Sequence, residues 1–249
     1  MVAIAMAPPP HFLSEHHPTG LSTGIFADAR APWRTMVRDA SRVSPFAVEL
    51  SALAESELDG LLTFLAGRPA LPFRYVSLHA PTKGRQLPER DLVRRLAETP
   101  RVVRAILTHP DVMDEPAVYA ALGWRACVEN MDSRKSLGQS SDDLAAIFEQ
   151  LPDAGFVFDI AHAHEVDPSM ELAADLLDRF RGRLRHVHLS SISDGRHVSL
   201  TAEDEETFAP HLARCLDVPW ILEAPPPERW SIAVNVDSSV ATAPRPVPA

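Results

Sequence analysis

The sequence predicts an α/β fold, most simply a closed (β/α)8 barrel, from three observations. Hydrophobic residues make up 45% of its 249 positions, which is enough apolar material for one large buried core. Short runs typical of β-strands alternate with amphipathic stretches typical of helices, and this alternation predicts a parallel sheet. Eight such strands within about 200 residues favour a closed barrel over an open sheet.

Each expected strand is a short run enriched in apolar residues. The first run, LSTGIF at 21–26, is only weakly apolar, whereas GFVFDI at 155–160 is strongly so. Along the chain the strands are expected at 21–26, 45–50, 73–79, 102–108, 124–129, 155–160, 184–190 and 218–223.

Helices are expected between these strands wherever apolar residues recur with helical spacing. The clearest patterns lie at 55–67, 88–98, 141–151 and 169–180. The stretches SSDDLAAIF and AESELDGLL both begin with a suitable capping residue followed by acids, as a helix start should. Little helical pattern follows residue 224, so the eighth helix is expected to be short or missing.

A single TIM-barrel domain is therefore expected over residues 20–224. Residues 1–19 form an N-terminal extension, and residues 225–249 form a short C-terminal segment that ends in the proline-rich ATAPRPVPA. No internal repeat is visible beyond the alternation of strands and helices.

Composition indicates which cellular compartment and which class of binding partner to expect. A net charge of −10 argues against an electrostatic, phosphate-tracking mode of nucleic-acid binding. Cys127 and Cys215 are too few for a disulfide framework, which favours a reduced, cytoplasmic location. The opening MVAIAMAPPPHF lacks the basic start of a signal peptide, and no apolar run is long enough to cross a bilayer, so no membrane association is expected.

Ionisable residues close six successive strands, from the third to the eighth. In a barrel the carboxyl ends of all strands meet around one mouth, so these side chains are expected to lie together. All are carboxylates or imidazoles, which are metal ligands. In chain order they are His79, His109, Glu129, Asp159 with His162 just beyond it, His188 and Glu223.

Each of these residues also has an ordinary structural explanation. A single strand-end histidine is more often a loop or core residue. Asp159 could cap the helix that follows, and Glu129 could begin a turn. Six coincident positions are harder to explain separately, because carboxylates gathered on an apolar rim are costly without a cation to neutralise them. The pattern therefore predicts a site for a divalent metal ion.

Further polar residues near the strand ends leave alternatives open. His197 lies in the seventh loop and is either a further ligand or a loop residue. His186 faces the same way as the histidine two residues later, one layer deeper, which favours a supporting or core role over ligation. Glu49 closes the second strand and either joins the site or lines the rim. His164 and the histidines of HFLSEHH at 11–17 are expected to face solvent.

Cations gather on the loops of the same mouth. Individually such residues are usually solvated loop side chains. As a group they predict an anionic small-molecule substrate, with arginine suited to a phosphate or carboxylate. The candidate substrate-binding residues are Lys83, Arg85, Arg134, Lys135 and Arg196. A glycine-rich phosphate loop, a Ser–His–Asp elbow and a CxxC pair are absent from the sequence.

Four strand-end motifs resemble those of the xylose isomerase-like TIM-barrel superfamily, which includes sugar isomerases and epimerases, endonuclease IV and UV-damage endonucleases. DIAHA at 159–163 is similar to the element after strand six, and VHLS at 187–190 to the histidine of strand seven. VEN at 128–130 and LEA at 222–224 resemble the two glutamate strands. The resemblance covers about residues 20–224 but depends on these separate motifs.

The resemblance implies between one and three divalent ions, of zinc, manganese or iron. In the sugar-acting branch one ion is held by a set that corresponds to Glu129, Asp159, His188 and Glu223. In the endonuclease branch, LHAP at 78–81 and THP at 108–110 would add His79 and His109. A third ion would use His162 and an Asp-x-His pair, but here Gly195 stands two residues before His197 and Asp194 is one place off.

Three functions follow as hypotheses. The first, which the sequence favours, is a metal-dependent isomerase or epimerase acting on a small anionic sugar, sugar phosphate or polyol, with Glu129 and Glu223 as ligands and one of them as base. The second is a multinuclear phosphoesterase of the endonuclease type. The third is a barrel that binds a metal or metabolite without catalysis. Acidic charge and short loops make nucleic acid the less favoured substrate.

Overall fold

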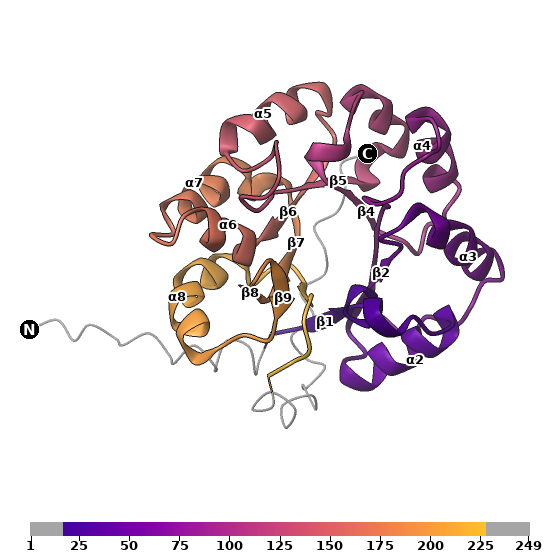
Figure 1. The fold of residues 1–249 in the computed structure, drawn as a ribbon, viewed down its shortest axis with the longest axis horizontal. Helices are drawn as coiled ribbons and strands as arrows, with labels where there is room; N and C mark the ends of the chain where they lie inside the picture. The colour runs from indigo at the N-terminus through magenta and orange to yellow at the C-terminus, as the bar shows by residue number, and fades with distance from the viewer. Residues whose placement is uncertain (1–16, 228–249) are drawn as a thin grey trace, which may run out of the picture.

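Eight parallel strands close into a barrel in the computed structural model, which describes residues 17–227 without the side chains of residues 27–29 (Figure 1). The order around the barrel is β1-β10-β7-β6-β5-β4-β3-β2. The strands are β1 (Thr19–Ser22), β2 (Ala47–Ser51), β3 (Tyr75–His79), β4 (Ala105–Thr108), β5 (Ala126–Glu129), β6 (Gly155–Asp159), β7 (Leu184–Leu189) and β10 (Trp220–Leu222). The predicted closed (β/α)8 barrel is confirmed.

Closure joins the first and last strands of the chain. Thr19 pairs with Trp220, and Leu21 with Leu222. On its other side β1 approaches β2 so closely that a Cβ on Gly20 would lie 2.5 Å from the carbonyl oxygen of Ala47. Glycine is therefore needed at this position of the first strand.

Helices cover the outside of the barrel (Figure 1). They are α2 (Trp33–Val43), α3 (Glu55–Ala66), α4 (Glu89–Ala97), α5 (Ser141–Gln150), α6 (Ile160–Val166), α7 (Glu171–Phe180) and α8 (Ala202–Leu212). The four helices expected from apolar spacing correspond to α3, α4, α5 and α7, whereas α2 and α8 were not expected. The helix α6 was anticipated only as the region that Asp159 could cap. None of the helices in the described part of the chain has the length and apolar character to span a membrane.

Short 3-10 segments replace regular structure at several connections. They are η1 (Thr23–Ala29), η2 (Pro110–Val112), η3 (Pro116–Arg125), η4 (Arg181–Arg183) and η5 (Ala213–Cys215). The expected strand at 21–26 is wrong at its end, because β1 stops at Ser22 and η1 begins at Thr23. The Ser22 hydroxyl accepts a hydrogen bond from the backbone N–H of Gly24 and so caps η1.

Two apolar clusters stabilise the barrel. The larger cluster packs strand residues such as Leu50, Val128 and Phe158 against the surrounding helices. The smaller cluster consists of Ala105, Leu107, Cys127 and Val157, with Tyr75 packed against it. Because side chains alternate between the two faces of a strand, this smaller set fills the barrel interior.

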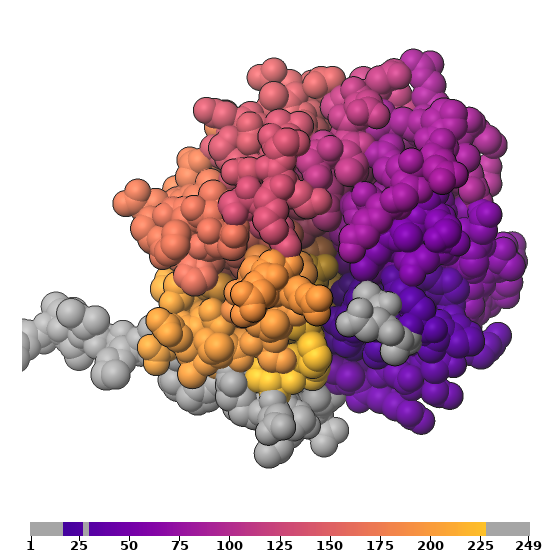
Figure 2. Space-filling model, in the orientation of Figure 1, coloured from indigo at the N-terminus to yellow at the C-terminus, as the bar shows by residue number. Residues whose placement is uncertain are grey.

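A two-stranded antiparallel hairpin extends the loop after β7. It consists of β8 (Ser191–Ser193) and β9 (Arg196–Val198), with Asp194 and Gly195 in left-handed backbone conformations at its turn. In the view of Figure 2 the surface is hollowed near its centre, beside the orange segment that contains this hairpin. The hairpin thereby brings the seventh loop over the mouth of the barrel.

Both predicted end segments fall largely beyond the described part of the chain. The expected N-terminal extension lies outside the described residues up to residue 16, and the proline-rich tail lies outside them from residue 228. Residues 223–227 form no helix, and any eighth helix after them would fall outside the described residues.

Candidate metal centre

The carboxyl ends of β3 to β7 and β10 bring the predicted ligands into three donor groups. These groups are His79, His109 and Glu129; then Glu129, Asp159, His188 and Glu223; then Asp159, His162 and His197. Within each group one donor atom from every residue lies within 4.8 Å of the others. All eight residues proposed as metal ligands belong to one of these groups.

The first group places two imidazoles against one carboxylate oxygen. The Nε2 atoms of His79 and His109 are 3.0 Å apart. Oε2 of Glu129 lies 3.2 Å from His109 Nε2 and 4.0 Å from His79 Nε2. That oxygen is buried and has no hydrogen-bond partner among the described residues. Two imidazole nitrogens converging on a buried, unpaired carboxylate oxygen form a donor set that suits a divalent ion.

The second group uses the other oxygen of the same carboxylate. His188 Nδ1 lies 2.7 Å from Glu129 Oε1 and 3.5 Å from Glu223 Oε1. Asp159 faces His188 across β6 and β7, because the two residues are directly paired in the sheet. Glu129 therefore belongs to both groups, with one carboxylate oxygen directed to each.

Asp159 combines a structural bond with a free donor atom. Its Oδ1 accepts a hydrogen bond of 2.8 Å from the backbone N–H of His162 and so caps α6. Its Oδ2 is buried and has no hydrogen-bond partner among the described residues. Asn130 holds the backbone of Asp159 on both sides, since its amide donates to the carbonyl at 2.8 Å and accepts from the N–H at 2.9 Å. The capping and metal explanations for Asp159 are thus compatible.

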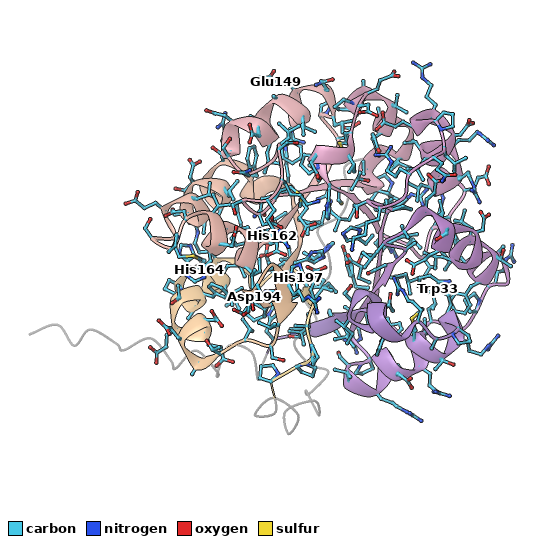
Figure 3. All side chains as sticks on the ribbon, in the orientation of Figure 1. Trp33, Glu149, His162, His164, Asp194 and His197 are labelled. Carbon is cyan, nitrogen blue, oxygen red and sulfur yellow. The ribbon has the colours of Figure 1, made fainter. Side chains whose placement is uncertain are left out.

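The third group is more open and includes the hairpin histidine. The imidazoles of His162 and His197 lie close, with ring centroids 5.3 Å apart, and both point toward the centre of the barrel mouth in Figure 3. His197 Nδ1 is 2.8 Å from the Ser190 hydroxyl, and its Nε2 is 3.5 Å from Glu223 Oε2. His164 instead lies on α6 with its ring edge-on to Phe208, away from this group.

The charges at the mouth are unbalanced without a cation. Burial raises the pKa of the Glu223 carboxyl, and the neighbouring Glu129, Asp159 and Glu49 raise it further, to well above its ordinary value. Burial lowers the pKa of His188, but the surrounding carboxylates overcome this and raise it well above normal. Carboxylates crowded around one imidazole are stabilised by a bound divalent ion.

Two histidines at the mouth are held neutral, which is the form that binds metal. Burial and, to a smaller extent, the neighbouring His109 together lower the pKa of His79 to about 4. Burial likewise lowers the pKa of His197 to about 4. Both imidazoles therefore offer a free nitrogen at neutral pH without first losing a proton.

The five candidate substrate-binding cations occupy different environments. Arg85 donates to the carbonyl of Val112 and lies 3.6 Å from Glu89, so it ties the loop after β3 to η2. Lys135 forms an ion pair of 3.0 Å with Asp111. Lys83 and Arg196 are exposed and make no ion pair within the described residues.

Arg134 has a more specific environment than its loop position predicts. Its guanidinium lies 2.7 Å from the buried carboxylate of Asp132 and donates to the carbonyl of Gly195 in the hairpin turn. A Cβ on Gly195 would lie 2.5 Å from Arg134 Nη1, so a side chain at this position would displace the guanidinium. Asp132 and Asn130 were not identified from sequence, although their polar character directly after β5 was a signal.

A family model also matches much of this barrel. The matched family is described as the xylose isomerase-like TIM barrel, and the match covers residues 111–234, from η2 past β10. These residues belong to a xylose isomerase-like TIM-barrel domain. The resemblance inferred from the strand-end motifs is confirmed. No curated protein sequence matches the chain.

Solved structures share the fold of this xylose isomerase-like barrel. The 3-keto-D-glucoside 4-epimerase of E. coli superposes with a TM-score of 0.58 at 12% identity, covering 88% of this chain and 97% of that one. Endonuclease IV from Thermus thermophilus gives 0.52 at 18% identity, with coverages of 86% and 95%. A probable 3-DHS dehydratase from Bacillus anthracis gives 0.54 at 14%, with coverages of 87% and 96%. These similarities concern the fold.

Proposed function

We propose that this chain is a divalent-metal-dependent hydrolase of phosphoesters that uses at least two ions and acts on a small anionic substrate. The observation that carries the proposal is the environment of Glu129. Its Oε2 lies among the imidazoles of His79 and His109, and its Oε1 lies 2.7 Å from His188. A carboxylate with one oxygen in each of two donor groups is suited to bridge two ions.

The donor types fit zinc, manganese or iron. Each of the two groups combines carboxylate with imidazole, the mixture that these metals accept, and His79 is neutral at physiological pH. When bound, a pair of such ions supplies Lewis acidity and an activated water for in-line displacement at phosphorus. Glu129 would set the separation of the pair, and Glu223 would complete the second group.

Positive side chains at the mouth would hold the anionic part of the substrate. Lys83 and Arg196 are exposed and without an ion pair among the described residues, so they are the freest candidates. Arg134 keeps one face against Asp132 and would add a positive charge near His197. Arg85 and Lys135 are engaged with protein partners, which favours a role in shaping the loops. A net charge of −10 favours a small substrate over nucleic acid.

A sugar isomerase or epimerase is the second candidate. Glu129, Asp159, His188 and Glu223 form a complete four-residue group without the strand-three and strand-four histidines. The raised pKa of Glu223, caused by burial and by neighbouring carboxylates, would let it carry a proton for acid–base chemistry. A structural neighbour is a keto-glucoside epimerase, whereas endonuclease IV is a neighbour from the phosphoester class. A barrel that binds metal or a metabolite without catalysis is the third.

The cytoplasmic location remains part of the proposal. Both cysteines, Cys127 and Cys215, are buried and unpaired, as expected in a reduced compartment.

His109→Ala separates the two enzymatic candidates. Removing this imidazole dismantles the first donor group and leaves the four-residue group intact, so we expect phosphoester hydrolysis to fall at least about 100-fold. The purified protein, loaded with zinc or manganese, is assayed on bis-p-nitrophenyl phosphate, p-nitrophenyl phosphate, an abasic-site oligonucleotide and a panel of ketoses. His164→Ala is the control, because its ring packs on Phe208 away from the donor groups.

Each of the three candidate functions predicts a different result in these assays. Ketose turnover that survives His109→Ala, with no hydrolysis of any phosphoester, would reject the hydrolase and support the isomerase. Failure of the metal-loaded wild type on every substrate would support the binding-only barrel.

A further inference from the structure

A second cluster of ionisable side chains lies deeper in the barrel, beneath His188. It consists of Glu49 on β2 and His186 on β7, with His188 shared between this cluster and the mouth. The relative exposure of all three is 0%. None of the chemistry proposed above uses Glu49 or His186, and such a buried set requires a physical explanation.

The three donor atoms form a nearly equilateral triangle. Oε2 of Glu49 lies 3.2 Å from His188 Nε2 and 3.4 Å from His186 Nε2, and the two nitrogens are 3.3 Å apart. Ligands of a tetrahedral zinc ion, with bonds of about 2.0–2.1 Å, are separated by about 3.3–3.4 Å. The deep cluster thus has the spacing of a metal site.

Hydrogen bonding alone does not explain the environment of both carboxylate oxygens of Glu49. Its Oε2 would have to accept from Ser77 at 3.0 Å and from both imidazoles, three donors on one oxygen. Its Oε1 is buried with no hydrogen-bond partner among the described residues. Both oxygens of a carboxylate can accept hydrogen bonds, but here all three donors lie at Oε2 and Oε1 accepts none from the described residues. A cation held by Oε2 and the two imidazole nitrogens could also bind Oε1, so that both oxygens of the Glu49 carboxylate would be occupied.

The surrounding residues allow the imidazoles to act as ligands. The Tyr75 hydroxyl lies 2.9 Å from His186 Nδ1 and can accept a hydrogen bond from it, which leaves Nε2 free to face the cluster. His188 directs Nδ1 toward Glu129 and Glu223 and Nε2 toward Glu49. Its ring therefore joins the deep cluster to the mouth, with one nitrogen directed to each. Ions bound at both nitrogens would require the ring to release its N–H proton and act as an imidazolate.

We propose that Glu49, His186 and His188 hold a further divalent ion of the zinc type inside the barrel, connected to the mouth through the imidazole of His188. Because every donor is fully buried, this site is closed to substrate and belongs to the structural class of metal sites. Its charge would neutralise Glu49 and fix the orientation of His188, a residue of the proposed catalytic centre. The site does not depend on which reaction the mouth performs.

Anomalous diffraction from crystals of the zinc-loaded wild-type protein tests the proposal directly. At the zinc edge we expect a peak between Glu49 Oε2 and the Nε2 atoms of His186 and His188. A peak among Glu129, Asp159, His188 and Glu223 with none in the deep cluster would overturn the inference and leave Glu49 as a hydrogen-bond acceptor for His188. A deep peak with none at the mouth would sustain it and refute the proposed hydrolase.

Metal content in solution gives an independent measure. Glu49→Gln and His186→Gln keep the approximate size of each side chain and are expected to lose one equivalent of zinc per chain, measured by elemental analysis after dialysis. His164→Gln is the matched control, because its ring packs on Phe208 away from the deep cluster, and it should retain the full content. Circular dichroism establishes that each variant is folded. Unchanged zinc in folded Glu49→Gln would contradict the proposal.

Discussion

Asp159 shows how one carboxylate serves both folding and the candidate centre. Its Oδ1 caps α6 and its Oδ2 stays unpaired among the described residues, facing the donor groups. Asn130, from the loop after the neighbouring strand, fixes the Asp159 backbone through two hydrogen bonds. Capping normally contributes about 1 kcal/mol to helix stability. The same interaction here also holds the free oxygen in place, which links the start of α6 to the position of a proposed ligand.

Glu129→Gln tests the bridging carboxylate. The change preserves size but removes the negative charge and replaces one oxygen with an amide nitrogen, which cannot bind metal. We expect turnover to fall by at least about 1,000-fold, with the far-ultraviolet circular dichroism spectrum unchanged. The measurement is kcat/KM of the metal-loaded protein, whichever substrate supports activity.

The control for this substitution is Glu149→Gln on the exposed face of α5, far from the mouth (Figure 3). Full activity in Glu129→Gln, or an equal loss in both variants, would contradict the role given to Glu129.

Sequence patterns could identify residues at strand ends but not contacts between different loops. The residues His79 to Glu223 were found because a barrel brings strand ends together, a rule that needs only the order of the strands. The pairing of Arg134 with Asp132 and Gly195 joins loops after β5 and β7 and depends on their conformation in three dimensions. The convergence of Glu49 on His186 required the register of β2 and β7 across the barrel.

Among the elements, apolar residues at helical spacing identified four of the seven α-helices in the described part of the chain. The helices α3, α4, α5 and α7 were expected from repeated apolar residues, and each buries such residues against the sheet. The helix α2 buries only Met36, Val37 and Ala40 in a polar sequence, and α8 contains Pro210. Proline inside α8 argued against a helix there, whereas α2 is as amphipathic as the helices that were expected and was missed.

The start of α8 provides a prediction for an element. The Thr201 hydroxyl accepts from the N–H of Asp204 at 3.1 Å, and the Asp204 carboxylate accepts from the N–H of Thr201 at 2.8 Å. Thr201→Ala removes this side-chain cap and is expected to lower the free energy of unfolding by about 1 kcal/mol, measured by urea denaturation. Thr201→Ser retains the hydroxyl and should be close to wild type. Equal losses in both variants would indicate that the cap is not the cause.

For the whole molecule, alternation of strands and helices was sufficient to predict closure, although the first strand was misplaced. Its apolar signal is weak because β1 is short and contains Gly20, which is required by the close approach of β2. The expectation that His17 faces solvent is wrong, because its side chain is buried and reinforces this junction from outside the sheet. Its Nε2 lies 2.8 Å from the Val218 carbonyl, and its ring centroid lies 3.9 Å from that of Trp220 on β10.

Acid should weaken this junction in the metal-free protein. Burial lowers the pKa of His17 to about 4 from an ordinary value of 6.5. The unfolded chain therefore takes up the proton first, and the stabilising effect of neutral His17 is complete above pH 6.5 and lost as the pH falls toward 4. The free energy of unfolding should therefore decrease as the pH falls across this range. In His17→Phe we expect this decrease to be smaller than in the wild type by roughly 2 kcal/mol or more.

Urea denaturation at several pH values measures the difference, and phenylalanine retains an aromatic ring against Trp220. Because other titrating groups are common to both proteins, they cancel in the comparison. Parallel stability curves for the two proteins would show that His17 does not titrate as the burial implies.

The pairing of β1 with β10 has a consequence for biosynthesis. A nascent chain emerging from the ribosome can assemble neighbouring strands β2 to β7 early, but the cylinder remains open until β10 arrives between β7 and β1. Glu223 directly follows β10 and is thus the last of the proposed ligands to be synthesised. The complete four-residue group can accordingly bind a metal ion only after nearly the whole barrel has been translated, even if the ion is present earlier.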